Sequence, residues 1–346
     1  MPYELPTDPR TERRARIGRL VGFAFAALLI ALIAYLGYVG YIGSEQLTDA
    51  PNRSANCRTP ATMGWEYEAV NYEKATDALV EAEEDPANCT TFVGGDPGDE
   101  LVSSDGIRLA GWYVPASSGI GPGGPTVVLT HGWGSNKSDM LPRAEVLHPS
   151  YNLVLFDLRN HGQSRGNLTT QGLTEELDLR AVIDWLEREK APGAIAVMGV
   201  SMGGAAVANE VEGDARVDAV ILESTHATIA NAAQARLDRA GYPLSLPGAW
   251  AILLGGLVRT GLDISSADPV QNVARLGERP LLIISGADDD TIGRTDAEDL
   301  LAAAQAAEVP ARLEVCDDAG HAASLAVCPE PYGTWVLGFL GDALGP

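Results

Sequence analysis

The chain contains 346 residues, 46% of them apolar, which suffices for one large core domain with additions. Its net charge is −23, and residues 44–346 hold 19 basic and 44 acidic side chains, a net charge of −25. Nucleic acid and anionic lipid head groups would repel such a surface, so the composition argues against a nucleic-acid partner.

The first predicted element is a membrane-spanning helix. Residues 1–19 contain five arginines and three acidic residues, and residues 20–43 (LVGFAFAALLIALIAYLGYVGYIG) carry no charge. At about 1.5 Å per residue this segment extends roughly 36 Å, enough to cross a bilayer of about 30 Å. Glu45 and Asp49 follow it. Arginines before and acids after the segment predict a basic cytoplasmic N-terminus, a single-pass signal anchor in the cell membrane, and an extracytoplasmic remainder.

Two other interpretations of residues 20–43 exist. A cleaved signal peptide usually has an apolar region of about 7–15 residues, and this one is longer, with no small-x-small site closely after it. A helix that packs on the core of a globular domain normally keeps a polar stripe toward water, and none interrupts the segment. We therefore expect an uncleaved anchor.

Residues 44–99 are predicted to form an extracytoplasmic extension with one charged helix from Glu66 to Glu84. From about Glu100 to the end, strands and helices alternate. A hairpin is expected over residues 101–115, with Asp105-Gly106 as its turn. Short apolar segments predict further strands at 126–132, 152–159, 194–199, 217–224, 280–286 and 311–318. This alternation is typical of an α/β fold in which helices flank a mostly parallel central sheet.

Residues 225–278 interrupt the alternation and predict a helical cap insertion. Within it, residues 241–258 carry no charge, but Pro243 and Pro247 leave an unbroken helix of about 11 residues, or roughly 16 Å, too short for a second membrane span. We expect a mobile apolar cap helix that contacts substrate, with core packing as the alternative. The candidate contact residues are Trp250, Leu253 and Leu257.

The segment Gly199-Val200-Ser201-Met202-Gly203 has the pattern GxSxG. The pattern alone is weak, but a buried strand precedes it and a small-residue helix follows it. This context predicts a nucleophile elbow, a sharp turn that lifts the serine hydroxyl above the sheet. A serine needs a base, and the chain has five histidines. The chain order of nucleophile, acid and histidine selects His321, which follows the last strand.

Several motifs between residues 100 and 346 resemble the α/β-hydrolase superfamily, in particular its monoacylglycerol-lipase-like and serine-aminopeptidase-like members. They are the hairpin DGIRLAGW (105–112), the HG-x loop at 131–134, the segment FDLRNHGQS (156–164), in which Asn160 stands where glycine is usual, and GADDDTI (286–292). The resemblance implies that Asp289 is the acid. Asp288, Asp290 and, less well placed, Glu223 are the alternatives.

The same resemblance implies where a reaction's oxyanion would bind. The backbone N–H of Met202, directly after the nucleophile, would be one donor, and the N–H of Trp133 in the HG-x loop would be the other. His131 would then support that loop rather than react.

The four cysteines fall into two sequence-local pairs, Cys57 with Cys89 and Cys316 with Cys328. No CxxC motif is present, so a zinc ribbon is not indicated. An oxidising exterior makes two disulfides plausible, while four buried thiols are the alternative.

Together these features predict a membrane-anchored serine hydrolase that requires neither cofactor nor metal and acts on a small or lipid-like acyl substrate. An ester is the first expectation. Amide or peptide cleavage and acyl transfer use the same groups, and a non-catalytic binding protein on this fold is the rival class. A dinucleotide-binding oxidoreductase is disfavoured because GVSMGG lacks the GxGxxG spacing.

Overall fold

The computed structural model of the chain describes residues 9–49, 56–71 and 100–345. Its centre is an eight-stranded sheet in the order β1-β2-β4-β3-β5-β6-β7-β8. The first two pairings, β1 with β2 and β2 with β4, are antiparallel, and all the others are parallel. The strands are β1 (Glu68–Val70), β2 (Ala110–Val114), β3 (Thr126–Thr130), β4 (Asn152–Asp157), β5 (Ile195–Val200), β6 (Ala219–Glu223), β7 (Leu281–Gly286) and β8 (Ala311–Cys316).

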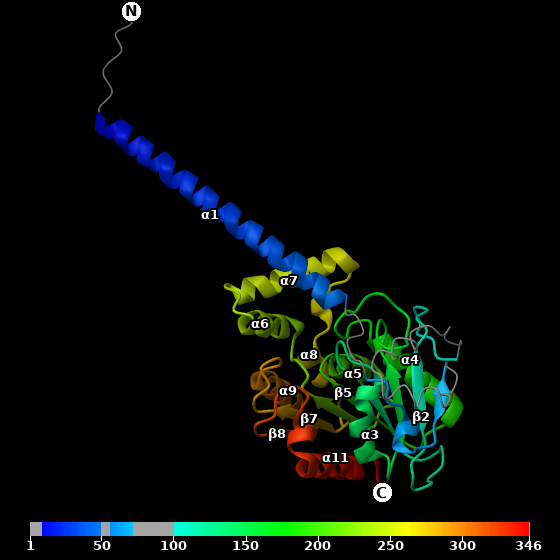
Figure 1. Ribbon diagram of the computed structural model, residues 1–346. Coiled ribbons are helices and arrows are strands. Elements are labelled where there is room, and N and C mark those ends of the chain that lie inside the picture. The colour runs from blue at the N-terminus through cyan, green and yellow to red at the C-terminus, as the bar shows by residue number, and fades with distance from the viewer. Residues whose placement is uncertain (1–8, 50–55, 72–99, 346) are drawn as a thin grey trace, which may run out of the picture.

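Helices cover both faces of this sheet, as the sequence predicts (Figure 1). One face packs against α4, α5, α8 and α9, and the other against α3 and α11. The helices are α1 (Pro9–Thr48), α3 (Leu141–Leu147), α4 (Glu176–Lys190), α5 (Met202–Gly213), α6 (Ile229–Arg239), α7 (Ser245–Thr260), α8 (Pro269–Val273), α9 (Arg294–Ala306), α10 (Ser324–Val327) and α11 (Pro329–Leu344). Short 3₁₀ turns are η1 (Pro60–Met63), η4 (Lys137–Met140) and η5 (Ile264–Ser266).

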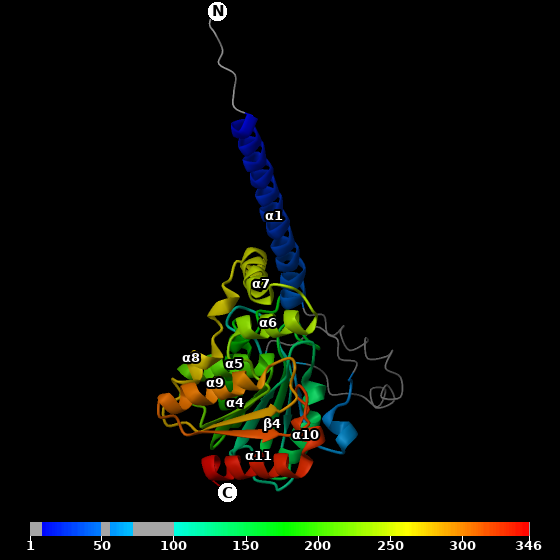
Figure 2. The ribbon, with the colours of Figure 1, turned by 90° about the vertical axis from the view of Figure 1, so that its left-hand side faces the viewer.

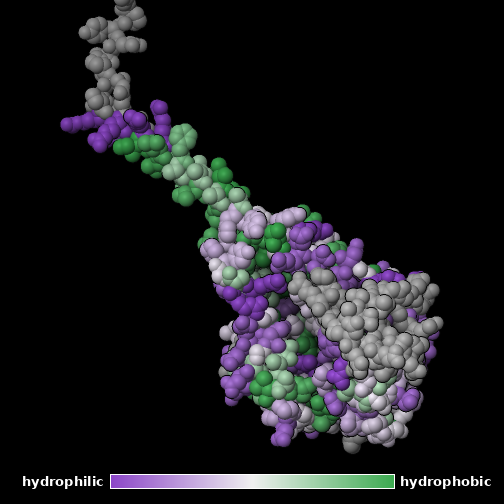
Figure 3. Space-filling model, viewed as in Figure 1, coloured by the Kyte–Doolittle hydropathy of each residue, from purple (hydrophilic) through white to green (hydrophobic). Residues whose placement is uncertain are grey.

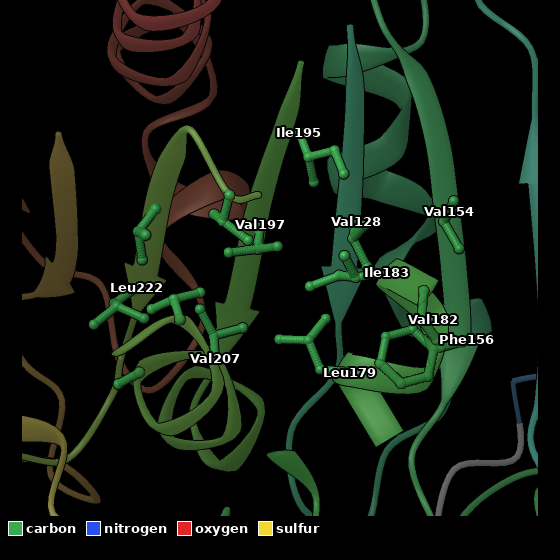
Figure 4. Close-up of a cluster of buried hydrophobic side chains, with 14 of the residues drawn as sticks. Val128, Val154, Phe156, Leu179, Val182, Ile183, Ile195, Val197, Val207 and Leu222 are labelled. Carbon is green, nitrogen blue, oxygen red and sulfur yellow. The ribbon is translucent and has the colours of Figure 1, made fainter. Parts of the chain in front are cut away.

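The core forms because successive strand residues point to opposite faces of the sheet. Val128 of β3 and Val197 of β5 belong to the cluster on the α4 and α5 side, whereas the neighbouring Leu129 and Met198 belong to the other cluster. Figure 4 shows the first cluster, in which side chains of α4 lie against β3 and β4. Because both faces are buried, the strands are almost continuously apolar.

The helix α1 is longer than the predicted anchor and runs without a break to Thr48. Among the described residues it is the one helix long and apolar enough to cross a membrane, judged by length and composition. Figure 3 shows hydrophilic residues at its start and an apolar stretch that reaches the folded domain. Its last turns pack beside α7, as the two ribbon views show (Figures 1 and 2).

Two details differ from the sequence-based expectations. Residues 68–70 form the edge strand β1, not the start of a helix, because they pair with residues 111–113 of β2. The rest of that predicted helix lies outside the described residues. In the predicted hairpin the turn at Asp105-Gly106 is present, but its arms meet in a single bridge between Val102 and Arg108. Residues 225–278, the predicted cap insertion, form α6, α7, η5 and α8.

Candidate active site

Ser201 occupies a strained turn between β5 and α5. Its backbone has φ 55° and ψ −121°, a conformation that costs a non-glycine residue about 1–3 kcal/mol. The turn is held by the Ser201 N–H, which donates to the Glu223 carbonyl at 2.8 Å. A Cβ at Gly203 would lie 2.6 Å from the Thr130 carbonyl oxygen, so this close approach requires glycine. The sequence therefore builds the predicted elbow.

The structure brings Ser201, His321 and Asp289 into one hydrogen-bonded line. His321 Nε2 lies 3.0 Å from Ser201 Oγ, and His321 Nδ1 lies 2.9 and 3.1 Å from the two carboxylate oxygens of Asp289. With the imidazole proton on Nδ1 donated to Asp289, Nε2 is free to accept the serine proton. The arrangement meets the distance requirement for a nucleophile, a base and a group that orients the base.

Asp289 is held in place by its own loop. Its Oδ1 accepts hydrogen bonds from the backbone N–H groups of Thr291 (3.0 Å) and Ile292 (2.9 Å). Burial raises the pKa of Asp289, but the hydrogen bond and charge of His321 and the Ile292 N–H outweigh burial and hold it below its usual value. Of the two neighbouring alternatives, Asp290 pairs at the surface with Arg239, and the Asp288 N–H donates to the Ala319 carbonyl. The geometry thus favours Asp289 as the acid.

Glu223, the other alternative acid, has a different role. It is fully buried and accepts hydrogen bonds from Arg143 at 2.6 and 2.8 Å and from the Tyr332 hydroxyl at 2.7 Å. Burial lowers the pKa of Arg143, but the Glu223 carboxylate more than reverses this and raises it. Arg143 also donates to the Ala322 carbonyl at 2.9 Å, directly after His321. This buried network therefore supports the histidine loop, a contribution that the sequence did not reveal.

Two further histidines order the loop of residues 131–134. His131 Nε2 accepts from the Leu158 N–H and Nδ1 donates to the Gly132 carbonyl, while His161 Nε2 accepts from the Gly134 N–H. Burial, together with the neighbouring His161, lowers the pKa of His131 to about 4, so it stays neutral and keeps one accepting nitrogen. The supporting role implied for His131 thus has a physical basis. The supporting role of His161 was not predicted, although this histidine lies in segment 156–164, which resembles the family.

The two expected oxyanion donors lie on elements that meet beside Ser201. Met202 is the first residue of α5, at the positive end of the helix dipole. A Cβ added at Gly132 would lie 3.3 Å from Ser201 Cβ, so the loop that carries Trp133 packs against the nucleophile. The Arg236 guanidinium of α6 lies 5.6 Å from the centre of the Trp133 ring. The cap therefore reaches the loop, while oxyanion binding by these two N–H groups stays a prediction.

The three cap residues predicted to contact substrate have different surroundings. Leu253 is buried in a small cluster with Ile229 and Ile264, which matches the core-packing alternative. Trp250 and Leu257 are exposed, and Trp250 lines a groove between α7 and α1. Their contact with substrate remains a prediction.

The predicted Cys316–Cys328 disulfide is confirmed, and it closes a loop that contains His321. Cys57 is also disulfide-bonded, but Cys89 lies outside the described residues, so the pairing of these two stays a prediction. Within the part of the chain that the structure describes, no three histidine, cysteine, aspartate or glutamate side chains gather as a metal site would require.

Known proteins resemble this chain in sequence and in fold. A model of the alpha/beta hydrolase family matches residues 127–332, more than half of the chain. The protein Rv2307c of Mycobacterium tuberculosis is 32% identical over 224 residues, which are 64% of this chain and 70% of that protein. YfhR of Escherichia coli K12 is 29% identical over 226 residues, 64% of this chain and 72% of that protein.

Solved structures resemble the fold at lower sequence identity. The Pyrococcus furiosus esterase Pf2001 superposes with a TM-score of 0.65 at 22% identity, covering 86% of this chain and 99% of its own. The acylaminoacyl peptidase of Pyrococcus horikoshii reaches 0.54 at 16% identity over 69% of this chain and 40% of its own. These two likenesses show a shared fold.

Proposed function

The chain belongs to the alpha/beta hydrolase family, and on that premise we propose that it is a membrane-anchored serine hydrolase that cleaves acyl esters outside the cytoplasm. The observation that carries the proposal is the position of His321, within hydrogen-bond distance of both Ser201 and Asp289. A non-catalytic protein would have no need to hold Ser201 in a strained turn with its hydroxyl on a histidine.

In the proposed reaction, Ser201 Oγ attacks the ester carbonyl carbon while its proton passes to His321 Nε2. Asp289 accepts the Nδ1 hydrogen bond and stabilises the imidazolium. The N–H groups of Trp133 and Met202 would hold the oxyanion of the tetrahedral intermediate. The C–O bond to the alcohol then breaks as His321 returns the proton to the leaving oxygen, which gives an acyl-enzyme. Water, deprotonated by His321, releases the acid and restores Ser201.

Three features support the location. The arginines before α1 and the acids after it favour an N-terminus inside the cell. The Cys316–Cys328 disulfide suits an oxidising compartment. The net charge of −25 over residues 44–346 would keep the domain soluble beside the membrane.

The test is a panel of chromogenic acyl esters and aminoacyl amides with the full-length protein, its Ser201→Ala variant and the control Ser265→Ala in the cap. Ester turnover that Ser201→Ala abolishes and Ser265→Ala retains would support the proposal. A fluorophosphonate should label the wild type and the control but not Ser201→Ala. Equal turnover in all three proteins would refute it, and turnover of amides alone would replace ester by amide cleavage.

A further inference from the structure

The surface of α7 carries an apolar stripe that stays more than half exposed in the described part of the chain. Residues at four-residue spacing lie on one face of a helix, and here that face contains Leu246, Trp250, Leu254 and Val258. Their exposed fractions are 52%, 56%, 62% and 79%. A helix at the surface of a soluble domain normally places polar residues on this face. The stripe instead lies within segment 241–258, which carries no charge.

The contact between α1 and α7 fixes where this stripe lies. Tyr35 donates its hydroxyl hydrogen bond to the Pro243 carbonyl, at the start of α7. A Cβ at Gly40 would lie 2.6 Å from the Ala251 carbonyl oxygen, so the two backbones touch. Near the end of α7, Arg259 Nε donates to Ser44 Oγ at 3.0 Å. The two helices therefore cross, as Figures 1 and 2 show, with the start of α7 beside Tyr35 and its end beside Ser44.

Of these three α1 residues, Tyr35 and Gly40 belong to the charge-free segment 20–43, and Ser44 follows it directly. If α7 lay wholly in water, the span would have to end before Tyr35. The 15 residues of segment 20–34 extend only about 22 Å, which is too short for a hydrocarbon core of about 30 Å. The membrane must then include residues 35–40 of α1, and α7 lies beside them at the same depth.

From this we infer that α7 is embedded in the membrane leaflet next to the catalytic domain, with its stripe against lipid acyl chains. At 16 residues α7 is about 24 Å long, too short to span, and both of its ends return to the domain. It therefore lies at the membrane surface as an interfacial helix. A groove of about 700 Å³ between α1 and α7, lined by Ile33, Leu36, Trp250 and Leu254 among others, would be filled by lipid chains.

The polar end of α7 agrees with this depth. Arg259 lies 4.6 Å above the Tyr41 ring and donates to the Tyr41 carbonyl, two positions before the charge-free segment of α1 ends. Arginine and tyrosine are typical of the membrane–water interface. The start of α7, beside Tyr35, lies closer to the membrane centre. The helix is thus tilted, with Leu246 deeper than Val258.

The inference rests on the membrane anchoring in the proposed function, and one experiment separates the two. Single cysteines replace Ile33 on α1, Leu246, Leu254 or Val258 on α7, and Leu337 on α11, which lies on the far side of the domain from α1 (Figure 1). The native cysteines that the structure describes, Cys57, Cys316 and Cys328, are in disulfides and leave the introduced thiol to react with a nitroxide label. The full-length protein is reconstituted in phosphatidylcholine vesicles, and collision rates are measured with lipid-soluble oxygen and with a water-soluble nickel chelate.

We expect an oxygen-to-chelate ratio at Leu254→Cys that matches Ile33→Cys and is several-fold above Leu337→Cys, with Leu246→Cys above Val258→Cys. A lipid signal at Ile33→Cys with a water signal at all three α7 positions would overturn the inference and leave the anchor intact. Water signals at every position would overturn the anchor and the inference together, without touching the ester chemistry, which the Ser201→Ala comparison tests separately.

Discussion

Removing Arg143 should destabilise the domain far more than removing an exposed arginine. Glu223 is 0% exposed, and Arg143 supplies two of its three side-chain hydrogen bonds, at 2.6 and 2.8 Å. Arg143→Met would leave that carboxylate buried with the Tyr332 hydroxyl as its remaining partner. Breaking one side of a buried ion pair typically costs about 3–5 kcal/mol, against a total stability of about 5–15 kcal/mol.

The measurement is equilibrium urea unfolding of the full-length protein in detergent, followed by tryptophan fluorescence. Arg275→Met is the matched control, because Arg275 pairs with Glu212 at 2.6 Å on the surface, where such pairs contribute about 0–1 kcal/mol. The double variant Arg143→Met/Glu223→Gln should recover part of the loss, since the unpaired charge is gone. Arg143→Met should also lower kcat, because the Ala322 carbonyl next to His321 loses the hydrogen bond that Arg143 donates to it at 2.9 Å.

The reasoning would be refuted if Arg143→Met unfolded at the same urea concentration as Arg275→Met. It would also fail if the double variant were less stable than Arg143→Met alone, because the buried charge would then not be the source of the loss. An unchanged kcat in a folded Arg143→Met protein would separate the two roles and leave only the structural one.

Three further predictions concern pH, the disulfide and the helix contact. Burial and a neighbouring histidine lower the pKa of both His131 and His226 to about 4, whereas histidines in the unfolded chain protonate near pH 6.5. The stabilising contribution of the two neutral histidines is therefore fully present above pH 6.5. It should fall by about 3 kcal/mol per histidine as the pH drops toward 4. His226→Leu should make that fall smaller by about 3 kcal/mol in urea unfolding measured across this range. Cys316→Ser should slow ester turnover before the domain unfolds, because His321 lies inside the closed loop, while Cys57→Ser should leave kcat unchanged. Gly255→Leu should lower the free energy of unfolding by about 1–3 kcal/mol, because a Cβ at this position would lie 2.5 Å from the Gly40 carbonyl oxygen. The control Gly338→Leu on α11 should leave the free energy of unfolding unchanged, because a Cβ there would meet no atom within 4 Å.

The sequence predicted the parts of the site that depend on local geometry. Ser201 stood out because an elbow needs a strand, small residues and a helix within a few positions, and all three are adjacent in the chain. His321 followed from chain order. The register of Asp289 among three consecutive aspartates came from the family resemblance, and the loop hydrogen bonds of Thr291 and Ile292 now give it a physical reason.

Contacts between distant residues could not be predicted in the same way. Arg143 and Glu223 are 80 positions apart, and Glu223 and Tyr332 are 109 apart, so no local pattern joins them. The strand β1 has three residues and a single partner strand, so its sequence carries too little alternation to indicate it. The helix α7, which begins in the charge-free segment 241–258, has 16 residues, more than the roughly 11 predicted, because Pro247 lies in its first turn, where proline is tolerated. Its partner, α1, lies about 200 residues away in the sequence.

The residues that join α1 to α7 suit a contact that has to hold in lipid. Inside a bilayer, apolar side chains are already out of water, so the hydrophobic effect does not drive helices together. Helices there associate through close packing of small residues. The α1–α7 contact is built that way, from Gly40, Ala251 and Gly255, whose backbones touch. Larger side chains pack beside this contact, because Ile252 of α7 clusters with Val39 of α1, while Leu253 clusters with Ile229 and Ile264 inside the cap. The helix α7 thus meets the anchor partly through touching backbones, as expected if it lies at the boundary between lipid and protein.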